Sequence, residues 1–438
     1  MSNLYLKAGG GGADPGWIRP TDWLPIPTIA SGEEVFYMLS QVNNVADGNF
    51  EAFSFTGNYK VDWGDGNIEN FASNVQANHS YNWADVGNVT SEGYRQALIK
   101  VTPQAGQHLT AFDFQKFYPG TSNQTSSNFL DIVYSAPYLA DGQGSAGFYR
   151  GGVYRYHNYC QRVWILDKGF CTNMYAAFYT YFRNLEKVIL PDMSDVTDAN
   201  FMFQKCSSLK LIDLFDTSGL TTAEQMFQGC YSLSSVPDFD FSNVITCSSM
   251  FSSSGIKHFS SNTLTIATGL SNLFASCSNI NRISLNIPLA TNLNNLATNA
   301  YSLQELEING GNLLNLQTSF SFCNALKKVT LTGTQNVTDM YGLFYQNSSI
   351  REIVVDATSV GNAALFADDA FCLEKLIMTG LKVGTSLKNT LLSAQALNDF
   401  FTSLGTATGS QTITITGSYG AATCDTTIAT AKGFTVVI

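Results

Sequence analysis

The sequence predicts a mainly β protein with short helices, built as a β-sandwich followed by a solenoid of stacked coils and a C-terminal α/β cap. One phrase recurs nine times at intervals of 23 or 24 residues between positions 185 and 373, and a phrase repeated this often is a building unit. Residues 34–116 instead show short runs typical of strands. All five Trp lie at or before Trp164, and all nine Cys lie at or after Cys160, which indicates two differently composed regions.

Residues 1–33 are predicted to form an attachment arm. The segment is Gly-rich at first and then carries three Pro with Trp17 and Trp23, a composition too stiff and too apolar for a simple linker. We predict that both Trp side chains bury against another protein. The alternative is that the arm folds over its own next domain.

Residues 34–116 are predicted to form the β-sandwich, with strands in the segments 33–40, 50–56, 59–63, 96–102 and 109–114. The stretch YKVDWGDGNIENFASNVQANHSY, residues 59–81, resembles the core signature of the PKD-type (Ig-like) sandwich. Its Gly64-Asp65-Gly66 turn explains the motif, because Asp65 is able to accept hydrogen bonds from backbone amides. Asp62, Asp65 and Glu69 are therefore interpreted as structural, and no metal site is predicted. The alternative is that these three acids bind a metal ion.

Residues 117–390 are predicted to form the solenoid, with 117–160 as linker and N-terminal cap. The pattern L-x-x-I-x-L describes a short strand, and each unit is too small to bury its own apolar face, so the units must stack. The pattern fails at Asp238 and Ser261, so the third and fourth coils should be irregular. The first apolar residue of each unit is Leu185, Leu209, Leu233, Ile256, Ile280, Leu303, Leu326, Ile350 or Leu373.

The phrases DVTDANFMFQKCSSLKLIDL and QNVTDMYGLFYQNSSIREIVV resemble the leucine-rich repeats of BspA-type bacterial surface antigens. The resemblance covers about residues 160 to 390 and implies a solenoid used for adhesion and binding. Residues 391–438 lie beyond the repeat and are predicted to cap it, with a helix up to Gly405 followed by two strands.

One charged residue per coil is expected to form a ladder on the strands. Two positions after the first apolar residue, the last five coils alternate in sign. In register, each charge would lie about 5 Å from an opposite one, which favours control of register over ligand binding. The ladder consists of Arg282, Glu305, Lys328, Glu352 and Lys375.

The densest aromatic run, residues 148–164, is the candidate ligand-binding segment. Amphipathic aromatic side chains stack well on sugar rings, which suggests a host-surface glycan or protein as partner. The alternative is that the run only caps the first coil. The candidates are Tyr149, Tyr154, Tyr156, Tyr159 and Trp164.

Composition argues against several functions. The net charge is −11 and no Lys/Arg run occurs, which argues against nucleic acid. No apolar stretch reaches 18 residues, so membrane insertion is not expected. Only four His occur, and no nucleophile, metal or phosphate-binding motif is present. We therefore predict no enzyme activity, no catalytic residues and no cofactor.

The stretch from Arg19 to Phe71 resembles the starts of structural proteins of tailed bacteriophages. The start of the sequence has no secretory pattern, and the Cys are expected to be buried free thiols. A surface adhesin is normally exported, whereas these two features point to folding in the cytoplasm. A virion that assembles in the host cytoplasm would have both the adhesin repeat and these features. We predict a fibre or tip adhesin, attached to other virion proteins by its arm and possible as a homo-oligomer. The alternatives are a head fibre or decoration protein without receptor binding and, ranked lower, a bacterial surface adhesin.

Overall fold

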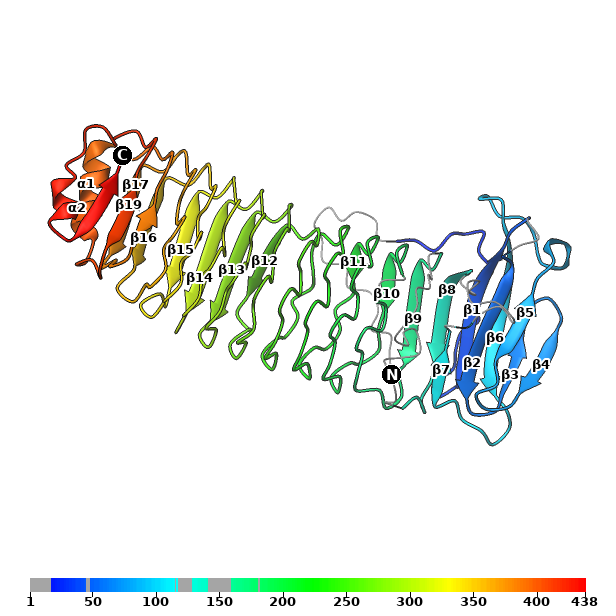
Figure 1. The fold of residues 1–438 in the computed structure, drawn as a ribbon. Coiled ribbons are helices and arrows are strands. Elements are labelled where there is room, and N and C mark those ends of the chain that lie inside the picture. Colours follow the sequence, from blue (N-terminus) through cyan, green and yellow to red (C-terminus); the bar gives the residue numbers. More distant parts are fainter. Residues whose placement is uncertain (1–16, 45–47, 115, 117–127, 141–158, 180–181) are drawn as a thin grey trace.

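The computed structural model describes residues 17–44, 48–114, 116, 128–140, 159–179 and 182–438. The molecule is an elongated rod, with an N-terminal sheet domain at one end and two short helices at the other (Figure 1). Stacked coils connect the two ends. The predicted fold class, mainly β with an N-terminal sheet domain and a solenoid, is confirmed.

The N-terminal domain is a sandwich of two antiparallel layers around an aromatic core. Phe36, Phe53 and Trp63 are buried in this core, and Phe36 stacks on Tyr134 with ring centroids 4.7 Å apart. The first layer has the order β4-β3-β6-β1-β8 and the second β5-β2-β7. The strands are β1 (Val35–Val42), β2 (Phe50–Thr56), β3 (Tyr59–Asp62), β4 (Ile68–Phe71), β5 (Ala77–Ser80), β6 (Arg95–Pro103), β7 (Ala111–Asp113) and β8 (Phe129–Ser135), with a 3-10 turn, η1 (Trp83–Asp85), before β6.

Strand β8 joins the sandwich to the solenoid. It pairs antiparallel with β1 on one side and parallel with the first coil strand on its other side. One eight-stranded sheet therefore runs from the sandwich into the solenoid. The segment 117–160, predicted as linker and cap, thus contributes a strand that covers the edge of the first coil.

Most coils of the solenoid contribute one short parallel strand, and all nine predicted marker residues, Leu185 to Leu373, are buried. The register follows the repeat, for example Ile283 opposite Leu306. The strands fall into three groups: β9 (Arg162–Asp167), β10 (Lys187–Ile189) and β11 (Leu211–Ile212); then β12 (His258–Ser261), β13 (Arg282–Ile287), β14 (Glu305–Gly310) and β15 (Lys328–Thr332); then β16 (Glu352–Asp356) and β17 (Lys375–Thr379).

The side of each coil opposite the strand is held by two kinds of alternating backbone hydrogen bond. The N–H groups of Phe201 and Phe203 donate to carbonyls of the next coil, whereas those of Met202 and Gln204 donate to carbonyls three residues earlier. This conformation needs a positive φ at Phe201 and Lys205 (60° and 63°). Almost every backbone donor of the turn is thus satisfied, half of them by a neighbouring coil.

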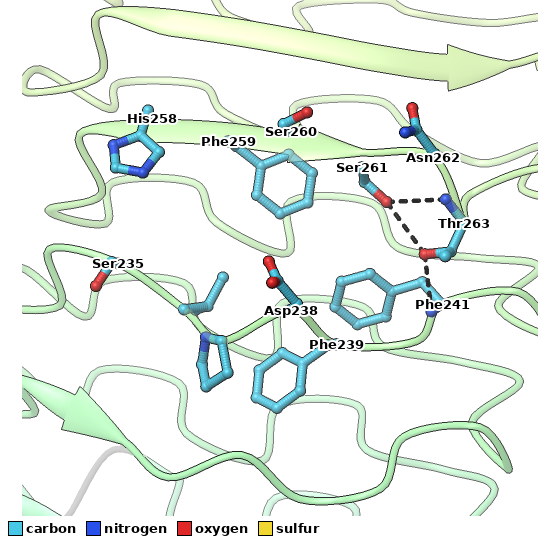
Figure 2. Close-up of a pocket in the computed structure, with 12 residues that line it drawn as sticks. Ser235, Asp238, Phe239, Phe241, His258, Phe259, Ser260, Ser261, Asn262 and Thr263 are labelled. Carbon is cyan, nitrogen blue, oxygen red and sulfur yellow. Dashed lines mark hydrogen bonds between the residues drawn. The ribbon is translucent and has the colours of Figure 1, made fainter. Parts of the chain in front are cut away.

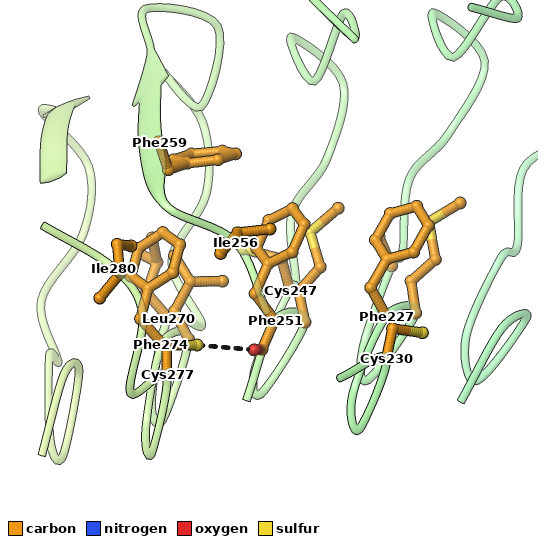
Figure 3. Packing of buried hydrophobic residues seen from close by; sticks show 14 of the residues in the cluster. Phe227, Cys230, Cys247, Phe251, Ile256, Phe259, Leu270, Phe274, Cys277 and Ile280 are labelled. Carbon is orange, nitrogen blue, oxygen red and sulfur yellow. Dashed lines mark hydrogen bonds between the residues drawn. The ribbon is translucent and has the colours of Figure 1, made fainter. Parts of the chain in front are cut away.

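The interior of the solenoid is a column of Phe rings and small polar groups. The rings of Phe203, Phe227, Phe251 and Phe274 stack at 5.5–5.7 Å with interplanar angles below 10°. Figure 3 shows three of these rings and the bond that the Cys277 thiol donates to the carbonyl of Phe251, 2.9 Å away. All nine Cys are free thiols.

The C-terminal end is closed by α1 (Ala394–Ser403), which buries Leu397, Phe400 and Phe401. The helix begins after Ser393, whose hydroxyl accepts the N–H of Ala396, as a Ser N-cap does. The strands β18 (Thr385–Ser386), β19 (Gln411–Thr414) and β20 (Phe434–Val437) form a small parallel sheet, with α2 (Thr427–Thr430) before β20. The predicted helix and strands of this region are confirmed.

Candidate ligand-binding site

The outward-facing side of the coil strands, here called the strand face, is interrupted at its third coil. Leu233 opens this coil, but residues 233–240 contain no strand. Pro237 lies where neighbouring coils have their strands. Because proline lacks an N–H and fixes φ, it removes a ladder hydrogen bond and ends pairing.

The fourth coil, in contrast, contains β12 despite Ser261. The predicted irregularity is therefore confirmed for the third coil and wrong for the strand of the fourth. Ser261 is buried and exchanges hydrogen bonds with Thr263, including a 3.2 Å contact between their hydroxyl oxygens. These contacts satisfy the hydrogen-bonding capacity of the Ser261 hydroxyl, which stands where most coils have an apolar side chain.

The missing strand leaves a hollow of about 340 Å³ between the third and fourth coils, here called the Pro237 hollow. This volume lies within the usual range of ligand pockets, about 300–1,000 Å³. Figure 2 shows side chains reaching it from both passes of the chain. Its lining residues are Ser235, Val236, Pro237, Asp238, Phe239, Phe241, His258, Phe259, Ser260, Ser261, Asn262 and Thr263.

The Pro237 hollow combines aromatic rings with polar groups that have free bonding capacity. Phe239, Phe241 and Phe259 are buried, and the rings of Phe239 and Phe241 have centroids 5.9 Å apart. Asp238 and His258 are exposed, and among the described residues neither side chain has a hydrogen-bond partner. A carboxylate accepts two or more hydroxyl hydrogens, while the rings offer apolar surface to C–H groups. The arrangement suits a sugar residue.

The predicted charge ladder is present as two segments rather than one. Arg282, Glu305 and Lys328 occupy one register row, and Glu352 pairs with Lys375 in a separate sheet. Strand β15 does not pair with β16, so the row is broken between Lys328 and Glu352. The ion pairs are exposed: Lys375–Glu352 at 2.5 Å and Arg282–Glu305 at 3.8 Å.

The aromatic candidates are only partly within the described structure. Tyr149, Tyr154 and Tyr156 lie outside the described residues. Tyr159 is 44% exposed, and Trp164 on β9 is 37% exposed at the start of the strand face. Trp164 lies far along the rod from the Pro237 hollow, so the structure does not bring these candidates into that site.

The arm packs on its own sheet, which is the second of the two interpretations given above. Trp23 is 4% exposed, contacts Leu39 and Leu130 in one buried cluster, and donates a 2.8 Å hydrogen bond to Tyr94 Oη. Trp17 packs beside it. Trp23 is therefore not available for docking to another protein in this conformation, because its side chain is already buried against β1 and β8.

The acids at and beside the Gly64–Gly66 turn have separate structural partners. Asp65 accepts from Asn67 N at 3.0 Å and lies 2.7 Å from His79 Nε2, and Glu69 accepts from Trp63 Nε1 at 2.8 Å. Burial alone would raise the pKa of Asp65, but these hydrogen bonds outweigh it and lower that pKa. No cluster of three or more metal-ligating side chains occurs in the part of the chain that the structure describes, nor does a helix long and apolar enough to cross a membrane.

Two structural features escaped sequence reasoning. Pro237 marks the hollow, and a proline at a strand position was a readable signal. A row of mostly Asn, Asp and Thr bridges every coil along the edge where the turns begin. Several of its side chains accept the N–H two residues later, as in an Asx-turn. The row is Asn173, Asp198, Thr222, Thr246, Gly269, Asn292, Asn315, Asp339 and Asn362.

Comparison with known proteins supports the repeat. Residues 245–371 match the family described as BspA type leucine rich repeat region, in six copies, and residues 172–287 match Mycoplasma protein of unknown function, DUF285. Curated proteins gave no match.

Two similar solved structures are described as leucine-rich proteins. A leucine-rich repeat protein from Bacteroides ovatus is 14% identical, with 72% of this chain and 80% of that chain covered and a TM-score of 0.36. A leucine rich cell surface protein from Faecalibacterium prausnitzii is 14% identical, with 69% and 84% covered and a TM-score of 0.32. The family match supports the predicted repeat type over residues 245–371.

Proposed function

We propose that the protein is a bacteriophage virion protein, a fibre or tip adhesin that binds the host surface through the strand face of its solenoid. The Pro237 hollow carries this proposal. It is a ligand-sized break in the strand face, and it presents Asp238 and His258 beside three Phe rings. A glycan of the host surface is the ligand that this chemistry suits.

Two features support the virion assignment. The PKD-like signature forms a connected unit, since Tyr81 Oη donates to the carbonyl of Trp63 at 2.8 Å and His79 stacks on the Trp63 ring. This agrees with the resemblance of the N-terminal stretch to phage structural proteins. The nine free thiols suit a chain that folds in a reducing cytoplasm before assembly.

We assign binding rather than catalysis to the Pro237 hollow. Its one carboxylate and one imidazole are both exposed, and neither is oriented by a neighbouring side chain within the described residues. General acid–base catalysis needs positioned groups. The hollow offers recognition groups instead.

A non-receptor structural component, such as a head fibre or decoration protein, is the second candidate. The observation that favours it is the unbroken eight-stranded sheet from β4 to β11. A continuous sheet joins the sandwich to the solenoid, and this makes the rod a rigid spacer.

The test is adsorption of fluorescently labelled protein and of virions to host cells. Asp238→Asn keeps the shape of the side chain but removes its charge. Glu307→Gln, on the same face and outside the hollow, is the matched control. We expect adsorption to fall about tenfold in Asp238→Asn, the loss of roughly one charge-assisted hydrogen bond, and to be unchanged in Glu307→Gln.

Equal adsorption of both variants and wild type would remove the hollow from the receptor site. Mass spectrometry of purified particles tests the virion assignment separately. Absence of the protein from particles would refute that assignment.

A further inference from the structure

A second hollow, of about 240 Å³, lies where the arm meets the first coil. It is here called the Trp164 hollow. Its walls are apolar, from Ile26, Ile29 and Val133 among others, and Trp164 and Arg162 of β9 line it as well. It is separate from the Pro237 hollow, which lies between the third and fourth coils.

The floor beside this hollow carries an excess of positive charge. Asp131 is fully buried and is shared by two arginines: Arg162 binds it with Nε and Nη2 at 2.8 and 2.6 Å, and Arg19 binds it with Nε at 2.8 Å. One carboxylate between two guanidinium groups leaves one charge uncompensated, in a chain whose net charge is −11.

Arg162 also has donors to spare. Its Nη1 group makes no hydrogen bond to any residue within the described ranges, whereas Arg19 uses Nη1 and Nη2 on the carbonyls of Trp23 and Leu24. The Arg162 guanidinium lies over the rings of Trp17 and Trp164, 5.5 and 5.7 Å from their centroids. These contacts hold the group rigid, so an incoming anion meets preorganised donors.

We propose that the Trp164 hollow binds the carboxylate of an acidic sugar. The carboxylate pairs with Arg162, and an apolar face of the sugar ring packs on Trp164, which is 37% exposed. The inference rests on the proposed function only in taking a host-surface sugar as the ligand. The volume accommodates one sugar unit rather than a chain.

The experiment measures binding of two probes to the full-length protein by calorimetry or saturation-transfer NMR. Methyl β-D-glucuronide and methyl β-D-glucoside differ only in the carboxylate at C6. We expect the glucuronide to bind at least about tenfold more tightly, because hydrogen bonds to charged groups contribute more than neutral ones. We also expect added salt to weaken its binding.

Three variants locate the site. Trp164→Ala removes the packing surface and should weaken glucuronide binding at least about fivefold. Arg162→Lys keeps a positive charge beside Asp131 but loses the guanidinium fork, and should reduce the preference for the glucuronide over the glucoside. Tyr231→Ala, 65% exposed on another coil, is the matched control and should bind as wild type does.

Equal affinity for both probes, undetectable glucuronide binding, or wild-type binding by Trp164→Ala would each overturn the proposal. The outcome is distinct from that of the adhesin proposal. Glucuronide binding without adsorption to cells would leave the carboxylate site intact and refute the receptor role. Adsorption without glucuronide binding would refute the carboxylate site and leave the receptor role intact.

Discussion

The buried Cys of the solenoid are hydrogen-bond donors as well as space-filling groups. The thiols of Cys206, Cys230, Cys277 and Cys323 each donate to a carbonyl of the preceding coil at 2.9–3.3 Å. Asn347 occupies the same place and donates its amide to the carbonyl of Phe320 at 2.7 Å. The slot therefore favours a small side chain, which donates to the preceding coil wherever it carries a donor.

This slot makes Asn347→Cys a stabilising change. Asn347 is buried, and its Oδ1 has no hydrogen-bond partner, which costs about 1–3 kcal/mol. A thiol keeps a donor and removes that acceptor, so the free energy of unfolding should rise by about 1 kcal/mol in urea titrations. The reciprocal change, Cys323→Asn, should lower it. A loss of stability in Asn347→Cys together with a gain in Cys323→Asn would contradict this account of the slot.

The carboxylate of Asp65 should make the sandwich sensitive to acid. Its pKa is lowered in the folded state, so its stabilising contribution is present above the unfolded value of about 3.9 and is lost as pH falls through the folded value. The stability difference between wild type and Asp65→Asn, measured by urea unfolding, should be largest near neutral pH and shrink at about pH 3. A difference independent of pH would contradict this role.

Among the elements, the interruption between β15 and β16 limits what the charge ladder contributes. Lys328 has Glu305 as its register neighbour but does not pair with Glu352 across the break. Lys328→Glu should therefore cost less than about 1 kcal/mol, as exposed pairs do, and should not affect adsorption. The uninterrupted ladder expected from sequence would give a larger loss, because three acids would then lie in a row.

Lys375→Glu is the comparison for that measurement, since it breaks a pair that is formed, Lys375–Glu352 at 2.5 Å. Both side chains are more than half exposed, so this cost is also expected to stay below about 1 kcal/mol. A loss in Lys328→Glu well above that in Lys375→Glu would show that the two sheets interact.

The missing strand of the third coil can be restored by substitution. Pro237→Thr returns a backbone N–H, and Asp238→Leu returns the apolar residue of the repeat. The double variant should extend pairing from β11 to β12 and raise stability by about 1 kcal/mol or more, from added apolar burial. It should also fill the Pro237 hollow and abolish adsorption. Unchanged adsorption with raised stability would place the receptor site elsewhere.

At the scale of the whole molecule, the arm is part of the fold. Trp23→Ala should lower the free energy of unfolding by about 3–5 kcal/mol, as truncation of a buried Trp does. Ile18→Ala, at a residue 73% exposed in the same arm, is the control and should have little effect. Unchanged stability in Trp23→Ala, with loss of the protein from particles, would instead favour the docking arm.

The sequence alone determined the repeat, because every coil needs a buried apolar residue at the same position. The nine marker residues follow one period, and the structure buries all of them. Five of the sandwich strands, the capping helix and the coil register were also readable, since alternation and helical spacing depend on local neighbours. Strands β4, β5 and β8 were not predicted. The shared coil position predicted the row of Arg282, Glu305 and Lys328 and the pairing of Glu352 with Lys375, but not the break between the two sheets.

The tertiary structure decided what depends on contacts between distant segments. The burial of Trp23 needs β1 and β8 beside it, and the sharing of Asp131 joins Arg19 to Arg162 across 143 positions of sequence. Neither contact follows a period. The two hollows also depend on distant contacts: one lies where a proline removes a strand between two coils, and the other lies where the arm meets the first coil. Pattern shows which side chains face inward, but only the assembled fold shows where the packing leaves space.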